Sequence, residues 1–152
     1  MENLSEEVRV FLEQFEANTN VGSPEEIVTQ FADVFMVADP SGARAVPSSV
    51  LLMAIPQRRK LFERVARSVT TLASVEQTRL DERYVLLKTE WLVKFDRGNG
   101  RSEDLALRST FVLYRSVDGI KIVLYLHHQD LMSVLRDRGF LLSDTLRLVH
   151  IS

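Results

Sequence analysis

The chemistry open to this sequence lies with a few polar residues set in otherwise apolar segments. Thr89, Ser109 and His128 interrupt stretches of alternating hydrophobicity, and Trp91 follows Thr89 by two positions. Burying such groups costs free energy unless they are hydrogen-bonded, so they predict either internal hydrogen bonds or a cavity that holds water or a ligand. In such a cavity the histidine could move a proton near neutral pH, and the indole would form a flat wall for a cyclic ligand.

The candidate catalytic residues are His128, Glu76 and Asp39. Glu76 would orient His128 or act as a second acid–base group. Asp39 would serve as a general base if burial raised its pKa, and the alternative is that it caps the turn it forms with Pro40. The predicted ligand pocket is lined by residues of one apolar face, namely Trp91, Thr89, Ser109, Ser74 and Phe111. The alternative to a pocket is a filled core in which His128 bonds to Ser109 or to a backbone carbonyl.

Motifs for metal or cofactor chemistry are absent from the sequence. It contains no P-loop, no G-x-S-x-G and no H-E-x-x-H motif, and it has no cysteine. Two of its three histidines, His127 and His128, are adjacent. Because neighbours on a strand point to opposite faces, these two are not expected to bind one ion together. We therefore expect no metal and no cofactor.

Length and charge restrict the class of protein further. A chain of 152 residues has the length of one domain and can bury a core without disulfides. A net charge of −2 with 26% charged residues provides no basic field for a nucleic acid. No apolar run approaches the roughly 20 residues that span a bilayer, and Met1–Glu7 is polar and acidic, unlike a signal peptide. These features predict a soluble, cytoplasmic protein with no nucleic-acid or membrane partner.

Helical signals dominate the first half of the chain. Ser5 would cap a first helix with an apolar stripe of Val8, Phe11, Leu12 and Phe15. A capping box at residues 23–26 begins a second helix, whose buried face would be Ile27, Val28, Phe31, Val34 and Phe35. A third helix is expected between Ser49 and Arg67, with a start or kink at Pro56 and a basic surface of Arg58, Arg59, Lys60, Arg64 and Arg67. Short apolar pieces on either side of the turn at residues 39–42 predict a small hairpin, Phe35–Ala38 with Ala43–Val46.

After Ser68 the hydrophobic period changes to two, which is typical of strands. Four long strands are expected, at Val69–Arg79, Tyr84–Asp96, Leu105–Arg115 and Ile120–His128. Their connections are short, so the strands form an antiparallel meander, and a short closing helix follows at Gln129–Arg138. Helices that cover only one face of such a sheet make an α+β domain.

The short turns also predict which residues are paired across the hairpins. Ser74 is expected opposite Thr89 and Leu72 opposite Trp91. Ser109 is expected opposite His128, Thr110 opposite His127, and Phe111 opposite Leu126. An even offset in the middle hairpin then yields one apolar face beneath the helices and one mixed face. The mixed face is the candidate dimer interface, with Glu90, Arg108, Thr110, Val112, Tyr125 and His127.

This order of elements resembles the nuclear-transport-factor-2-like (NTF2-like) superfamily, in particular its small bacterial SnoaL-like members. The features that carry the resemblance are the phenylalanine-rich segment Ile27–Phe35, the turn at Asp39-Pro40, and the final strand Gly119–His128. The resemblance implies an NTF2-like domain over residues 1–139, a cone-shaped curved antiparallel sheet wrapped around N-terminal helices. It also implies an apolar pocket and a homodimer through the outer face. The apolar tail 140–152 lies outside the family pattern and is expected to pack on the domain or on a dimer partner.

Three functions remain open at this point. The first is a homodimeric pocket protein that binds a small apolar or cyclic ligand, with cofactor-free isomerase, cyclase or dehydratase activity as its catalytic form. The second is a non-catalytic assembly module that acts through its outer sheet face. The third is a regulatory partner that uses the basic helix at Arg58–Arg67.

Overall fold

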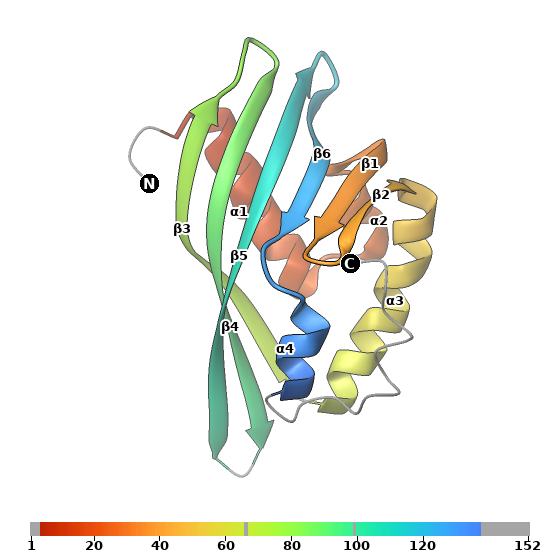
Figure 1. Cartoon of the computed structure of the whole chain (residues 1–152), viewed down its shortest axis with the longest axis vertical. Coiled ribbons are helices and arrows are strands. Elements are labelled where there is room, and N and C mark those ends of the chain that lie inside the picture. Colours follow the sequence, from red (N-terminus) through yellow and green to blue (C-terminus); the bar gives the residue numbers. More distant parts are fainter. Residues whose placement is uncertain (1–3, 66, 99, 138–152) are drawn as a thin grey trace.

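The protein folds as a curved six-stranded sheet, and the helices of its N-terminal half lie on one side of it (Figure 1). The structure is a computed structural model and describes residues 4–65, 67–98 and 100–137. The elements, in chain order, are α1 (Glu6–Val21), α2 (Pro24–Val28), β1 (Phe31–Asp39), β2 (Gly42–Pro47), α3 (Ser48–Val65), β3 (Arg67–Arg79), β4 (Tyr84–Gly98), β5 (Arg101–Ser116), β6 (Gly119–His127) and α4 (Leu131–Asp137). The predicted α+β class is confirmed. The tail 140–152 lies outside the described residues.

The strand order in the sheet is β2-β1-β6-β5-β4-β3. Neighbouring strands are antiparallel except for β1 and β6, which pair in parallel. The four strands of the predicted meander are therefore confirmed, and the small N-terminal hairpin of β1 and β2 extends their sheet. None of the helices in the described part of the chain is long and apolar enough to cross a membrane.

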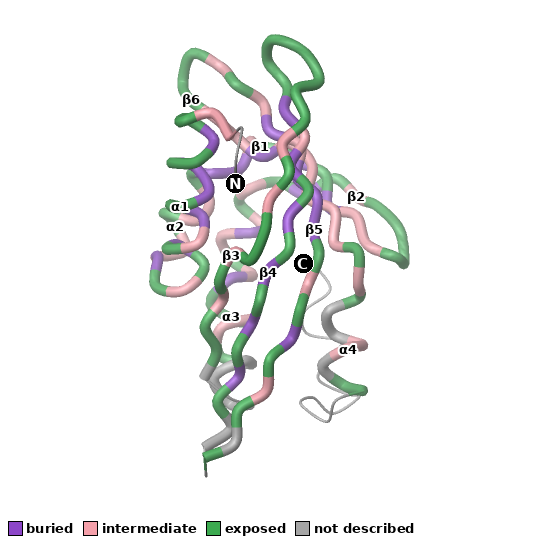
Figure 2. Tube along the Cα trace, turned by 90° about the vertical axis from the view of Figure 1, so that its left-hand side faces the viewer, coloured by how far each residue is buried: buried purple, intermediate pink, exposed green. Residues whose placement is uncertain are grey.

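Helix α1 lies across the concave face, behind β3, β4 and β5 in the view of Figure 1. Its side chains Val8, Phe11, Leu12 and Phe15 are buried, as their spacing predicted. Asn20 attaches the end of the helix to the edge strand β3, because its Oδ1 accepts from the backbone N–H of Thr70 and its Nδ2 donates to the carbonyl oxygen of Thr70, both at 2.8 Å. In Figure 2 the buried segments recur along α1, β4 and β5, between exposed ones.

The prediction that the second helix extends to Phe35 is wrong. The capping box at Ser23 is present, but α2 ends at Val28, and the phenylalanine-rich segment continues as strand β1. Phe31 and Phe35 are buried, whereas Val34 is 60% exposed, which is the alternation of a strand. A spacing of four residues fits one face of a helix and one face of a strand equally well, so the two phenylalanines did not discriminate between them.

Two β-bulges change the predicted pairing. In β3 the register shifts between Leu72 and Ser74, which leaves Ala73 as the extra residue. In β6 the shift lies opposite Val112 and Leu113, and Val123 is the extra residue. The pairing of Leu72 with Trp91 and the even offset between β4 and β5 are confirmed.

The pairings beside the bulges are off by one residue. Ser74 lies opposite Glu90 in place of Thr89. Ser109, Thr110 and Phe111 lie opposite His127, Leu126 and Tyr125, respectively. Because side chains alternate between faces, each one-residue shift moves the following residues to the other side of the sheet.

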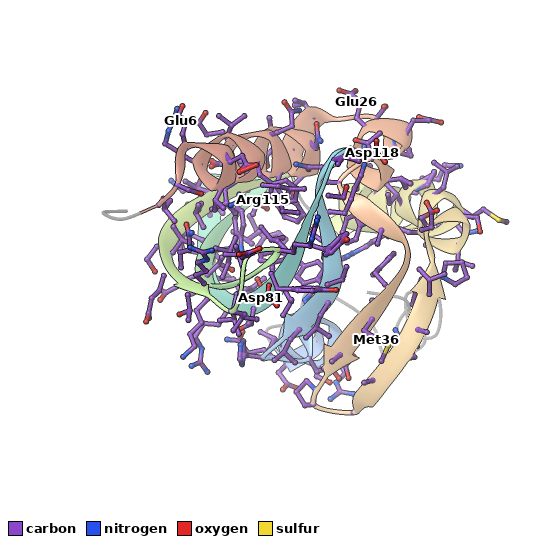
Figure 3. The ribbon with its side chains drawn as sticks, turned by 90° about the horizontal axis from the view of Figure 1, so that it is seen from above. Glu6, Glu26, Met36, Asp81, Arg115 and Asp118 are labelled. Atoms are coloured by element: carbon purple, nitrogen blue, oxygen red, sulfur yellow. The ribbon has the colours of Figure 1, made fainter. Side chains whose placement is uncertain are left out.

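The outer face of the sheet carries an apolar row that crosses five strands. Its members are successive partners in the strand pairing, namely Ala45, Met36, Leu124, Val112 and Leu86. Met36 is 39% exposed, and in Figure 3 it lies at the side of the molecule opposite to helix α1 with Glu6. We refer to these five residues as the outer row.

Candidate functional site

The inner face of the sheet brings together polar and aromatic side chains from four strands. Strand pairing aligns Arg44, Val37, Tyr125 and Phe111 in one row, because Val37 pairs with both Arg44 and Tyr125 and Phe111 pairs with Tyr125. Asp39 and His127 lie two residues beyond Val37 and Tyr125 on parallel neighbouring strands, and they therefore lie on the same face.

Three of the sequence-predicted site residues lie elsewhere. His128 is exposed on the outer face, where its Nε2 is 2.7 Å from Thr110 Oγ1. Ser74 and Glu76 are also exposed, and they pair with Glu90 and Lys88 of the outer face. The physical reason is the pair of bulges, which reverses the orientation of β6 after Val123 and of the part of β3 that follows Ala73.

The same bulge in β6 places two predicted dimer-face residues on the inside. Tyr125 stacks on Phe111 with ring centroids 4.6 Å apart, and His127 lies 4.1 Å from the ring of Tyr125. The rings of Phe15, at 6.2 Å, and Phe31, at 6.3 Å, complete the aromatic surroundings of Tyr125. Tyr125 and His127 are therefore inner-face residues, and their assignment to the outer face is wrong. Glu90, Arg108, Thr110 and Val112 do lie on the outer face.

The predicted pocket residues Thr89, Ser109 and Trp91 are adjacent and buried, and they bond to one another. Trp91 Nε1 donates to Thr89 Oγ1 at 2.8 Å, and Thr89 Oγ1 donates to the carbonyl oxygen of Ser109 at 2.8 Å. The two hydroxyl oxygens are 2.9 Å apart, so Thr89 uses its one donor and both acceptor positions. The polar groups of Thr89 and Trp91 are therefore hydrogen-bonded within the protein.

Burial and neighbouring charges keep the inner-face imidazole neutral. Desolvation, followed by the Arg58 guanidinium, lowers the pKa of His127 to about 4, although the Asp39 carboxylate acts in the opposite direction. Desolvation likewise raises the pKa of the Tyr125 phenol and lowers the pKa of Arg58 on α3. At neutral pH the site therefore contains an uncharged imidazole and an uncharged phenol between charged residues.

Asp39 forms the turn that its sequence context predicted. Its Oδ1 accepts hydrogen bonds from the backbone N–H of Ser41, at 2.8 Å, and from the Ser41 hydroxyl. The side-chain bond from Ser41 is the main reason that the pKa of Asp39 lies below its ordinary value. The raised pKa expected of a general base is thus contradicted, and Asp39 is an anion that faces His127 and Arg44.

Two buried side-chain polar atoms of the described residues have no hydrogen-bond partner, and both belong to this site. They are Nη2 of Arg44 and Nε2 of His127. Buried polar groups are nearly always paired, so two unpaired nitrogens on one face form the most distinctive feature of the site. One feature of the sequence indicated that the orientation of His127 could not be predicted. The run Ile120–Leu126 is apolar at every position but Lys121, so no alternation set its orientation.

The described residues contain no group of three or more histidine, aspartate or glutamate side chains that could hold a metal ion. Part of the basic surface of α3 makes contacts within the protein. Arg59 Nη2 donates to the backbone oxygen of Asn18 at 3.1 Å, and the charge of Arg58 affects the pKa values of Tyr125 and His127. The side chains of Arg64 and Arg67 lie outside the described residues.

Comparison with known proteins identifies the fold. No protein-family model matches the sequence, and no characterised protein matches it. Among solved structures, an NTF2-like protein with a cystatin-like fold from Novosphingobium aromaticivorans is similar at TM-score 0.68 and 12% identity, over 96% of this chain and 88% of that chain. An NTF2-like protein of unknown function from Shewanella oneidensis MR-1 is similar at TM-score 0.61 and 13% identity, over 81% of this chain and 97% of that chain.

A third similar structure, from Catenulispora acidiphila, is a complex with S-DNPA and matches at TM-score 0.67 and 14% identity, over 84% of this chain and 94% of that chain. Identities this low establish the fold alone. The chain is therefore an α+β protein with the NTF2-like, cystatin-like fold.

Proposed function

We propose that this NTF2-like domain binds a small molecule against the inner face of its sheet, beside Arg44, Tyr125 and His127. The observation that carries the proposal is the pair of buried, unpartnered nitrogens, Arg44 Nη2 and His127 Nε2. Leaving a buried polar group unpaired costs about 1–3 kcal/mol, and a ligand that supplies an acceptor atom would remove this cost.

The surroundings of these nitrogens support a ligand site. Small-molecule sites combine apolar and aromatic walls with a few convergent polar groups. Here the aromatic part is Phe111 stacked on Tyr125, and the polar part comes from β2 and β6. The structural neighbour from Catenulispora acidiphila, a complex with S-DNPA, is consistent with ligand binding by this fold.

Binding is better supported than acid–base catalysis. A general base works best when its pKa lies near the operating pH, whereas the pKa of His127 is about 4. Such an imidazole is a weak base at neutral pH and serves better as a neutral hydrogen-bonding group. An isomerase, cyclase or dehydratase activity would need a bound ligand that raises this pKa.

The two adjacent histidines allow a matched test. His127→Phe removes the unpartnered nitrogen from the inner face, and His128→Phe makes the same substitution on the outer face. The indole N–H signal of Trp91, the only tryptophan, reports on the site because Trp91 bonds to Thr89 and through it to Ser109. In a fragment screen we expect ligands that shift this signal to bind wild type and His128→Phe alike and to lose affinity for His127→Phe. Ligands that bind all three proteins equally would refute the proposed location.

We also propose that the domain forms a homodimer through the outer row, because this face is more apolar than solvent exposure requires. Val112→Glu places a charge within that row. Val117→Glu makes the same change in the β5–β6 turn, where the side chain is 97% exposed. Light scattering should show a dimer for wild type and Val117→Glu and a monomer for Val112→Glu. A monomeric wild-type protein, or a dimer in all three, would contradict this interface.

A further inference from the structure

We propose that the ligand of the inner-face site is a small organic carboxylate, whose oxygens bind Arg44 Nη2 and His127 Nε2. This inference rests on the proposed small-molecule site and specifies its chemical class. It follows from which atoms lack partners, from the charges around them, and from the apolar rings beside them.

The unpartnered atoms are both nitrogens, and no described residue accepts a hydrogen bond from either of them. A guanidinium N–H can only donate, and the imidazole nitrogen donates in the tautomer that carries its proton on Nε2. Both belong to one face of the sheet, Arg44 on β2 and His127 on β6, with β1 between them. A carboxylate has two acceptor oxygens and is therefore suited to two such donors at once.

The charges at the site also favour an anion. Arg44 on β2 and Arg58 on α3 are cations, and among the described residues Asp39 on β1 is the one anion that acts on His127. Asp39 already accepts two hydrogen bonds from Ser41 through Oδ1. The remaining groups near His127 are the neutral phenol of Tyr125 and His128 on the opposite face. Besides desolvation, two cations, Arg58 and Arg44, lower the pKa of His127, whereas the anion Asp39 raises it.

Aromatic rings define the other half of the ligand. Tyr125 lies between the ring of His127, at 4.1 Å, and the ring of Phe111, at 4.6 Å. A ligand that reaches His127 Nε2 therefore lies beside stacked rings, which favours a planar apolar group attached to the carboxylate.

Matched pairs of an acid and its amide separate charge from shape. The probes are benzoate and 2-naphthoate, each with its primary amide, titrated by calorimetry and followed through the Trp91 indole signal. We expect each carboxylate to bind about tenfold or more tightly than its amide, as a hydrogen bond to a charged group implies. Arg44→Gln should abolish that preference, because the carboxylates lose more affinity than their amides. Arg115→Gln is the charge-matched control, because Arg115 pairs with Glu7 at the surface.

The outcomes separate this inference from the proposed function. Equal or tighter binding of the amides, lost in His127→Phe, would overturn the carboxylate class and leave the inner-face site in place. A carboxylate preference that survives Arg44→Gln, or that Arg115→Gln reduces equally, would overturn the role of Arg44. If neither carboxylate binds at about 10 mM, the inference is wrong, and the fragment screen with His127→Phe decides the proposed function separately.

Discussion

Replacing His127 by glutamine should remove a large part of the acid sensitivity of this fold. The pKa of His127 is lowered to about 4 in the folded protein from an ordinary value of 6.5, chiefly by desolvation. The unfolded chain therefore takes up a proton below pH 6.5 that the folded protein takes up only near pH 4. The contribution of neutral His127 to stability is therefore complete above pH 6.5. It decreases as the pH falls from 6.5 to about 4, and it does not decrease further below about 4.

The magnitude follows from the gap between the two pKa values. At about 1.4 kcal/mol per pKa unit the gap corresponds to about 3 kcal/mol. Because His127 is partly exposed as a whole residue, solvent screening reduces this to about 2 kcal/mol. The free energy of unfolding of a typical domain is about 5–15 kcal/mol, so this contribution is a substantial part of it.

Urea unfolding between about pH 7.5 and about pH 4 measures this quantity. Wild type and His128→Gln, the control on the outer face, should each lose about 2 kcal/mol more over this range than His127→Gln. Acidic residues contribute to the pH dependence of all three proteins, so only the difference between the variants is interpreted. If the pH profile of His127→Gln is parallel to that of wild type, then His127 is not desolvated, and the inner-face orientation of β6 after Val123 is wrong.

Two further predictions concern the elements that hold the site. Asn20→Ala removes both hydrogen bonds to the backbone of Thr70 and should lower the free energy of unfolding by about 1–3 kcal/mol. In hydrogen exchange the amide of Thr70 should lose protection first. Unchanged protection of this amide would contradict the attachment of α1 to β3. Phe111→Ala removes a ring that is 1% exposed at the centre of the aromatic cluster, and it should lower the free energy of unfolding in urea by about 3–5 kcal/mol. A decrease below about 1 kcal/mol would mean that Phe111 is not a core residue.

Much of the secondary structure could be predicted because its signals are local. Ser5 caps α1, Ser23 begins α2, and Gly119 with its φ of +112° follows the tight β5–β6 turn. Each of these signals depends on side chains within a few residues of the backbone that they stabilise. The apolar stripe of α1 and the strands β3 to β6 were predictable for the same reason.

The first half of strand β1 was not predictable in this way, although Phe35–Ala38 was expected in a small hairpin. Phe31 and Phe35 satisfy a helical and a strand period alike, and the segment becomes a strand because it pairs with β2 on one side and with β6 on the other. The partner β6 begins at Gly119, far along the chain, and nothing near Phe31 indicates it.

The candidate site shows the same division between local and tertiary information. The sequence by itself determined that Thr89 and Trp91 share one face of an alternating strand, and the even offset assumed for the middle hairpin, which the structure confirms, adds Ser109 to that face. Only the tertiary structure decided that His127 and Tyr125, and not His128, join them. A single extra residue, Val123, reverses the orientation of every residue after it, and its position depends on the pairing of β6 with β1 and β5. In an apolar run without alternation, packing against neighbouring strands determines which side chains face the core.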